Sequence, residues 1–270
     1  MGGIILVTSC KGGVGKSTVA ANLSMFLALS GCRTLLIDCD LSMRCLDLIL
    51  GLESSVMYDL YDVMVRDIAF GKAIVVYERE PNLSFCAAPF KYEPSEKFTP
   101  ESFGKEVSEI KESAQFEYIV IDTAAGIGMS LDMAAYSADT ALIVATHHPA
   151  SIRGAERTGE YLNAGNNTIL YKRLIVNCFE LGTVPDIIEI IDHSYLQLIG
   201  VVPYSKQLAK EQYAGRLADT LNKTDFNTYT AFENIAERIR GGNVPLMSGF
   251  KNYKKQKKGL ILTYGYSDHS

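Results

Sequence analysis

A short glycine-rich segment near the amino terminus has the composition of a phosphate-binding loop. It reads Cys10-Lys11-Gly12-Gly13-Val14-Gly15-Lys16-Ser17-Thr18. Glycines allow backbone N–H groups to turn toward phosphate oxygens, and the Lys16 ammonium adds positive charge for the outer phosphates. The Ser17 hydroxyl is a natural Mg²⁺ ligand, and the Thr18 hydroxyl is a further phosphate donor. The residues expected to bind phosphate are Gly12, Gly13, Val14, Gly15, Lys16, Ser17 and Thr18.

The order of elements around this loop distinguishes a ligand site from an ordinary turn. A glycine-rich strand-to-helix turn can exist without a ligand, and Cys10 stands where the general GxxxxGK pattern has its first glycine. However, an apolar strand precedes the loop and an amphipathic segment begins at Ser17. Strand, loop, GKST ending and helix follow in the order of a phosphate site, so we interpret the segment as one.

Three aspartates follow the ends of two other apolar runs. The second strand closes with Asp38 and Asp40, and the fourth closes with Asp122. An acid at the end of a parallel strand lies on the ligand edge of the sheet, so all three can face one Mg²⁺–phosphate centre. A single aspartate there is as often a helix cap as a metal-site residue. The three together with the loop indicate a site.

The elements that must position these residues alternate between strand and helix. Strands are predicted at Ile4–Ser9, Thr34–Asp38, Leu83–Ala87, Tyr118–Asp122, Thr140–Thr146, Arg173–Cys178 and Leu198–Pro203. Helices are predicted at Ser17–Ser30, Val56–Arg66, Ser102–Ser113, Ser130–Tyr136, Ser151–Asn163, Val184–Asp192 and Phe226–Arg240. This alternation predicts an α/β fold, a mostly parallel twisted sheet between two helical layers.

Composition and charge divide the chain into a body and a tail. The 270 residues are 47% hydrophobic and 21% charged with a net charge of −5, which excludes disordered, collagen-like and coiled-coil proteins. Five lysines and one aspartate in 241–270 give that segment +4 and leave −9 for 1–240. We expect one domain over 1–240 and a basic tail over 241–270, beginning where Gly241 and Gly242 stop the last helix.

The compartment is expected to be the cytoplasm. No run of about eighteen apolar residues predicts a membrane-spanning helix, and the amino terminus lacks the basic start and the cleavage site of a signal peptide. The six cysteines are scattered without a CxxC pair, as in reduced proteins without a zinc or iron–sulfur site.

With these residues in hand, the sequence resembles the MinD/ParA family of deviant Walker ATPases, and within it the MinD branch most closely. The extra lysine of the loop, Lys11, is the family's signature. A second motif similar to the family's DxDxxxRNLDLIMG runs from Asp38 to Gly51, and the segment FEYIVIDTAAGI surrounds Asp122. The resemblance covers about 1–240 and implies a P-loop NTPase fold.

The resemblance implies Mg²⁺-dependent hydrolysis of ATP to ADP and phosphate. Lys16 would bind the phosphates, and Lys11 would reach the partner's phosphates across an ATP-bound homodimer. Asp40 would position the attacking water, while Asp38 and Asp122 would join Ser17 as metal-site residues by holding Mg²⁺ through its waters. The catalytic residues expected on this basis are Lys11, Lys16 and Asp40.

The adenine site is expected at the ends of the last two strands. By the same resemblance, Asn177 would lie against the adenine edge and the loop after Pro203 would cover the base. For Asn177, a buried polar group at the end of a strand is an equally good interpretation.

The implied role is a molecular switch that dimerises with ATP and regulates cell division in space at the membrane. Implied partners are a second copy, a MinC- or MinE-like regulator and an anionic membrane surface contacted by 246–262 from the cytoplasmic side. The residues Leu246, Met247, Phe250 and Tyr253 could share one helical face beside several lysines, although two glycines interrupt it. A solvated, disordered lysine-rich tail is an equally good interpretation.

Alternatives of other classes remain open. A ParA-like or flagellar-placement-like positioning ATPase shares the loop, although the −9 body argues weakly against DNA as a partner. Two departures from the MinD pattern, Cys45 in place of Asn and Gly154 in place of an Asp used in partner contacts, motivate a nucleotide-gated scaffold with little turnover.

Overall fold

The chain is described by a computed structural model that covers residues 2–165, 169–180, 187, 190, 194–217 and 224–251. The helix predicted at Val184–Asp192 lies outside the described residues apart from positions 187 and 190. Within the described ranges, no helix has both the length and the apolar character needed to cross a bilayer.

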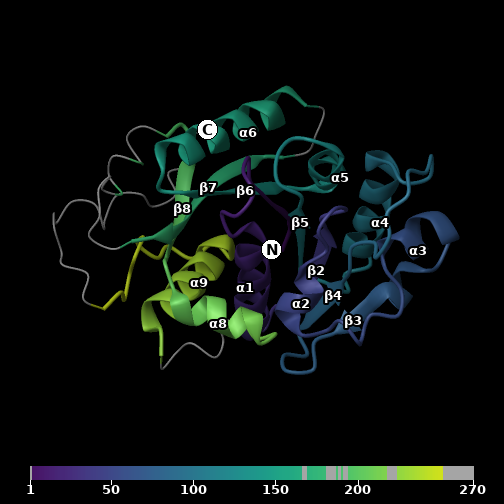
Figure 1. Cartoon of the computed structure of the whole chain (residues 1–270), viewed down its shortest axis with the longest axis horizontal. Coiled ribbons are helices and arrows are strands. Elements are labelled where there is room, and N and C mark those ends of the chain that lie inside the picture. The colour runs from purple at the N-terminus through teal and green to yellow at the C-terminus, as the bar shows by residue number, and fades with distance from the viewer. Residues whose placement is uncertain are drawn as a thin grey trace.

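A single twisted sheet forms the centre of the described structure (Figure 1). Its strands are β1 (Ile4–Thr8), β2 (Thr34–Cys39), β3 (Ile74–Val76), β4 (Leu83–Cys86), β5 (Tyr118–Thr123), β6 (Thr140–Thr146), β7 (Tyr171–Phe179) and β8 (Gln197–Pro203). The spatial order is β3-β4-β2-β5-β1-β6-β7-β8, and β3 alone pairs antiparallel with its neighbour. The predicted mostly parallel sheet is confirmed.

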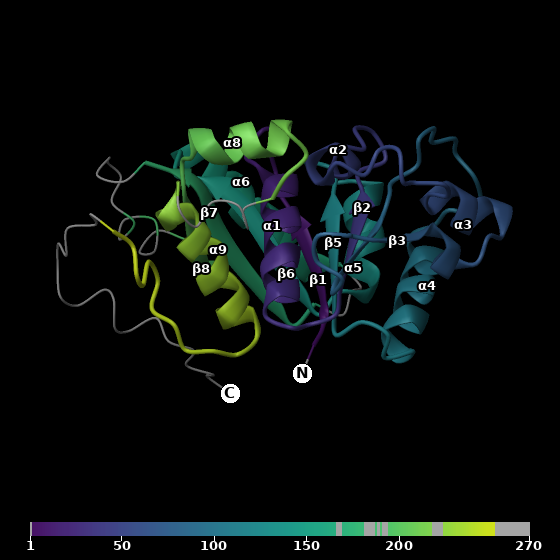
Figure 2. The same ribbon diagram turned by 90° about the horizontal axis from the view of Figure 1, so that it is seen from below.

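Helices cover both faces of this sheet (Figure 2). They are α1 (Lys16–Leu29), α2 (Leu46–Leu50), α3 (Leu60–Arg66), the 3₁₀ turn η1 (Phe70–Ala73), α4 (Pro100–Glu112), α5 (Met129–Ser137), α6 (Pro149–Ala164), α8 (Lys206–Tyr213) and α9 (Phe226–Ile239). One apolar core lies under α1, α8 and α9, and a second lies under α4, α5 and α6. The three-layer arrangement follows because the central strands are apolar on both faces.

The predicted elements are confirmed where apolar patterns are long. All seven predicted strands form within one or two residues of their predicted ends, and Asp38 pairs in register with Asp122 across β2 and β5. Sequence analysis missed β3, α2 and α8, which are too short to show a period. The helix predicted from Val56 begins only at Leu60, because Asp59 caps it and forms a capping box with Asp62.

Residues 244–251, here called the strap, are held against α9 and β8 by hydrogen bonds. The buried guanidinium of Arg238 donates to the carbonyls of Val244 at 2.6 Å, Ile199 at 2.9 Å and Pro245 at 2.5 Å. The amide of Asn234 donates to the carbonyl of Ser248 at 2.8 Å. Arg238 therefore joins the strap to α9 and, through the Ile199 carbonyl, to β8, a strand at the edge of the described sheet.

The strap corrects part of the expectation that Leu246, Met247, Phe250 and Tyr253 share one helical face. The described residues 246–251 form turns, and Met247 and Gly249 have positive φ angles of 59° and 77°. Leu246, Met247 and Phe250 are half-buried against the two cores. The prediction failed here because hydrogen bonds from α9 override a weak local helical pattern. Tyr253 and the remainder of the predicted segment lie outside the described residues.

Candidate nucleotide-binding site

The glycine-rich loop links the end of β1 to the start of α1 at the carboxyl edge of the sheet. Gly13 and Gly15 have φ angles of 79° and 84°, which residues with a Cβ rarely adopt. A Cβ on Gly15 would also overlap the Nδ2 atom of Asn177. Helix α1 begins directly after Gly15, and the unpaired N–H groups at the start of a helix can bind an anion.

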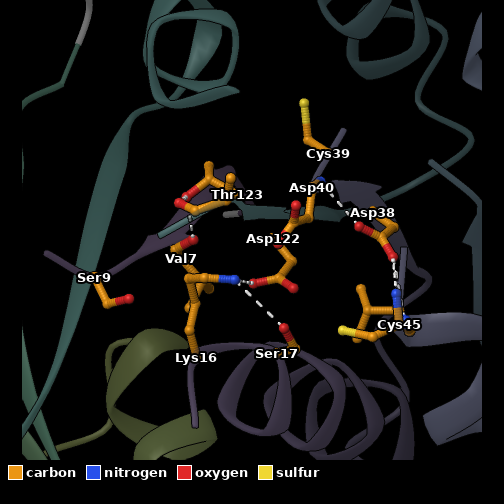
Figure 3. Close-up of polar contacts among 12 residues, drawn as sticks. Val7, Ser9, Lys16, Ser17, Asp38, Cys39, Asp40, Cys45, Asp122 and Thr123 are labelled. Atoms are coloured by element: carbon orange, nitrogen blue, oxygen red, sulfur yellow. Dashed lines mark hydrogen bonds and ion pairs between the residues drawn. The ribbon is translucent and has the colours of Figure 1, made fainter. Parts of the chain in front are cut away.

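Lys16 and Asp122 form a buried ion pair at the centre of this edge (Figure 3). The Lys16 Nζ lies 3.0 Å from Asp122 Oδ1 and 3.4 Å from the Ser17 hydroxyl. Asp122 is fully buried; burial raises the pKa of its carboxyl and its contacts with Lys16 and Ser17 lower it, but among the described residues no donor has hydrogen-bond geometry toward its other oxygen, Oδ2. Because a buried carboxylate oxygen without a partner is costly, this atom fits a hydrated cation such as Mg²⁺.

Asp38 lies beside Asp122 and fixes the segment that follows β2. Its carboxylate accepts hydrogen bonds from the N–H groups of Asp40 at 3.0 Å, Cys45 at 3.2 Å and Leu46 at 3.1 Å. Burial and the neighbouring Asp122 raise the pKa of Asp38 to about 7, although the N–H groups of Asp40 and Leu46 oppose the shift. A cation bound here would favour the ionised form, so the arrangement fits Mg²⁺ held through water.

Asp40 lies in a tight turn of its own. Its Oδ1 accepts hydrogen bonds from the Ser42 hydroxyl at 2.6 Å, the Ser42 N–H at 3.1 Å and the Met43 N–H at 3.1 Å. The side chain is buried at the same edge as Asp38 and Asp122. The turn therefore holds the carboxylate in one orientation close to the other two acids.

The thiol of Cys45 faces the Ser17 hydroxyl (Figure 3). Burial raises the pKa of Cys45 to about 11, although the hydrogen bond with Ser17 opposes the shift. The thiol is therefore neutral at physiological pH. Sequence analysis identified Cys45 only as a departure from a motif, and the fold places it against the expected Mg²⁺ ligand.

The departures at Cys10 and Gly154 meet in space. A Cβ on Gly154, in α6, would lie 2.9 Å from the Cβ of Cys10 and 3.1 Å from its sulfur. A side chain at position 154 would therefore require Cys10 to shift. The cysteine at the first loop position and the glycine in α6 are thus neighbours in space, and we expect substitutions at the two positions to affect each other.

Three predicted residues remain: Asn177 and Pro203, expected near the adenine, and Lys11, expected to reach a partner. Asn177 lies at the end of β7 and donates from Nδ2 to the Val14 carbonyl at 2.8 Å, so it supports the loop. Pro203 ends β8, three strands from β1 in the order of the sheet. Lys11 is exposed, in contrast to Lys16, which is only 7% exposed. A lysine facing solvent can reach a second molecule, whereas a buried one cannot.

Sequence analysis missed two polar residues at this edge. Ser130 bridges the ends of two strands, because its hydroxyl donates to the Cys39 carbonyl at 2.5 Å and accepts from the Ala124 N–H at 2.8 Å. Gln212 in α8 accepts a hydrogen bond from the Thr18 hydroxyl at 3.1 Å. Neither lies in a motif, and no local pattern in the sequence could have identified them.

The parallel sheet, the left-handed glycines and the buried lysine with its carboxylates define a P-loop nucleotide-binding protein. An AAA domain family profile matches residues 2–175. The chain is also 34% identical over 268 residues to the septum site-determining protein MinD of Bacillus subtilis, which covers 97% of this chain and 96% of the relative. The chain therefore belongs to the MinD family of P-loop ATPases.

Solved structures agree with this assignment. The MinC:MinD cell division protein complex of Aquifex aeolicus contains a chain with a TM-score of 0.80 and 32% identity, covering 93% of this chain and 99% of that one. The septum site-determining protein MinD of Pyrococcus horikoshii, complexed with Mg-ADP, has a TM-score of 0.78 and 27% identity, covering 88% and 96%. The fold expectation is thereby confirmed.

Proposed function

We propose that this chain is a Mg²⁺-dependent ATPase that dimerises with ATP and acts as a MinD-type switch in the spatial regulation of cell division at the membrane. The observation that carries the proposal is the buried Lys16–Asp122 pair, with a spare carboxylate oxygen beside Ser17. Membership of the MinD family supports the cellular role.

Nucleotide binding would use the loop and Lys16. The loop N–H groups would donate to phosphate oxygens, and the Lys16 ammonium would neutralise the outer phosphates. Ser17, Asp38 and Asp122 would hold Mg²⁺, the two aspartates through water. Bound Mg²⁺ supplies charge neutralisation on the phosphates. Asn177 and the loop after Pro203 would form the adenine site.

Hydrolysis would depend on Asp40 and Lys11. The turn at Ser42 holds the Asp40 carboxylate, which would accept a hydrogen bond from the attacking water. The exposed Lys11 would act in the partner's site, so that turnover requires the dimer. Removal of either side chain should reduce turnover more than it reduces nucleotide binding.

The membrane contact would come from residues beyond the strap. Leu246, Met247 and Phe250 of the strap pack against the cores, so they are not free to contact a membrane. The proposed membrane contact is therefore the lysine-rich segment 252–270. Each lysine near an anionic surface contributes about 1 kcal/mol. Two tails on an ATP dimer would add their attractions, so membrane binding would be reversible.

ATP turnover of the full chain, measured with and without anionic liposomes, tests the proposal. We expect Mg²⁺-dependent hydrolysis that liposomes change, and near-complete loss of hydrolysis in Lys11→Ala and in Asp40→Ala. An inactive wild-type chain that still binds ATP would favour the nucleotide-gated scaffold, for which the Cys45–Ser17 contact and Gly154 provide the motive. ATP-dependent binding to DNA rather than to liposomes would favour the ParA-like alternative.

A further inference from the structure

One side chain beside the phosphate loop has a hydrogen-bonding group without a partner. Gln212 lies on α8, and its Oε1 accepts the hydroxyl proton of Thr18 at 3.1 Å. Its Nε2 is buried, and no described residue accepts a hydrogen bond from it. A buried amide N–H without an acceptor is costly, so this donor is placed for a state in which it has one.

The position of α8 is fixed at both of its ends. Ser205 caps the start of the helix by accepting from the Leu208 N–H at 2.9 Å. After the helix, Gly215 packs closely against Gly51, the residue that ends α2. The α2 helix in turn begins where the backbone N–H groups donate to Asp38. The α8 helix that carries Gln212 therefore lies between the phosphate loop and the end of α2.

The Thr18 hydroxyl has one proton and can donate it to only one acceptor. In the structure the acceptor is Gln212 Oε1, so a phosphate oxygen that accepted this proton would have to replace Gln212 as the acceptor. A phosphate oxygen that took the proton would leave Gln212 Oε1 without a donor and Thr18 Oγ1 with free lone pairs. Rotation of the Gln212 amide by about 180° would then bring Nε2 to Thr18 Oγ1. In each state one group of the amide would pair with Thr18, the oxygen without phosphate and the nitrogen with it, so the rotation changes which group is paired and not how many are paired.

We infer that Gln212 is a positioning residue for nucleotide binding, which holds the Thr18 hydroxyl when phosphate is absent and donates to it when a nucleoside di- or triphosphate is bound. The inference rests on the proposed nucleotide site and adds α8 to it. The loop determines that the ligand is a phosphate compound, and Gln212 affects the binding of this ligand only through its hydrogen bond with Thr18. Glutamine suits this position because it can both donate and accept.

Binding of Mg²⁺·ADP to the full chain, measured by calorimetry, tests the inference. Gln212→Glu cannot donate when ionised, so it should retain the Thr18 proton and weaken binding about tenfold at pH 8. Lowering the pH to about 4.5 protonates a sizeable part of a glutamate with the ordinary pKa of about 4.3, restores a donor and should bring the ratio of variant to wild type closer to one. Gln212→Met should weaken binding by about threefold at both pH values, because it neither donates nor accepts.

Ala209→Glu is the matched control, since it adds the same charge to an exposed position of the same helix. It should bind within about twofold of the wild type. A Gln212→Glu variant that binds as well as Ala209→Glu at pH 8 would overturn the inference. The inference would also be overturned if Gln212→Glu lost as much Mg²⁺·ADP affinity in a Thr18→Val background as in the wild type, because Gln212 is inferred to act through the Thr18 hydroxyl. Failure of the wild type itself to bind Mg²⁺·ADP would instead contradict the proposed function.

If Gln212→Glu does not fold, the side-chain amide of Gln212 can be followed by NMR in the wild type. We expect the exchange of its Nε2 protons with solvent to slow at least about threefold on addition of Mg²⁺·ADP, as a new acceptor is gained. Unchanged exchange in a chain saturated with Mg²⁺·ADP would overturn the inference.

Discussion

The nucleotide edge and the strap both contain buried polar side chains, but these side chains differ in how many of their hydrogen bonds are made within the chain. At the strap, the buried Arg238 gives its protons to three carbonyls. At the nucleotide edge, Asp122 and Gln212 each keep one buried polar atom without a described partner.

This difference distinguishes polar groups that support the fold from polar groups that can bind a ligand. A buried polar group that only supports the fold is most stable when all its hydrogen bonds are made within the chain. A group that receives a ligand must hold some of its hydrogen-bonding capacity in reserve, at a cost to stability. Buried polar atoms without a described partner occur elsewhere in the chain as well, but those of Asp122 and Gln212 belong to side chains that contact Lys16 and Thr18 of the loop, where a ligand could use them.

The largest expected effect is at Lys16. Lys16→Ala should weaken Mg²⁺·ADP binding by at least about 100-fold, because a buried charge-assisted contact to phosphate is lost. Lys11→Ala is the control within the same loop and should change ADP binding by less than about threefold, since the Lys11 side chain is exposed. Calorimetric titration measures the affinity of both variants, and an equal loss of affinity in the two would contradict the different roles assigned to the two lysines.

Arg238 should affect stability without affecting the nucleotide. Arg238→Met removes the three hydrogen bonds that the guanidinium donates to carbonyls and should lower the free energy of unfolding by about 2–4 kcal/mol. Its affinity for Mg²⁺·ADP should stay within about twofold of the wild type. Arg240→Met, which removes an exposed pair with Glu237, should cost less than about 1 kcal/mol in urea unfolding. A strong loss of affinity in Arg238→Met would show that the strap is coupled to the site.

The contact between Cys10 and Gly154 predicts a change of sign between two backgrounds. Gly154→Ala should destabilise the chain by about 1–2 kcal/mol, because the new Cβ overlaps Cys10. In a Cys10→Gly background the same substitution should stabilise by up to about 1 kcal/mol, the usual gain for alanine inside a helix. A double-mutant cycle of unfolding measures the difference, and additive effects would contradict the contact.

The smallest expected effect is on the pH dependence of stability without nucleotide. Burial raises the pKa values of Asp38 and Asp122 in the folded chain, and the value for Asp38 is about 7. The stabilising contribution of these carboxyls is complete below about pH 4 and is lost as the pH rises toward 7. Asp122→Asn removes one of the two titrating carboxyls and also removes the negative charge that raises the pKa of Asp38.

The unfolding free energy of Asp122→Asn should therefore rise relative to the wild type as the pH increases from 5 to 8. Urea unfolding at several pH values measures this trend. A difference that is constant over this range would show that neither acid is perturbed in the free protein.

Sequence patterns predicted the parts of the site that lie within single segments. The loop from Gly12 to Thr18 and the strand-end acids Asp38 and Asp122 are local features, and parallel pairing of β2 with β5 brings the acids together. The three-layer fold follows from strand and helix periods in the same way. These features were predictable because each depends on residues close in the chain.

The contacts that sequence analysis missed join distant segments. Thr18 and Gln212 are 194 positions apart, and Asn177 reaches Val14 across 163 positions. Such pairs leave no periodic pattern, because they depend on how α8 and β7 pack beside the loop. The strap was missed for the same reason, since its conformation is imposed by α9.

The most direct test of the site is a calorimetric titration of the full chain with ADP, in the presence and absence of Mg²⁺, for the wild type and for Asp122→Asn. If the spare Asp122 oxygen serves the cation, Mg²⁺ should strengthen ADP binding to the wild type by at least about tenfold and should have less than about threefold effect on Asp122→Asn. Equal Mg²⁺ dependence in the two proteins, or no binding of ADP to the wild type, would contradict the assignment of this edge as a Mg²⁺–nucleotide site.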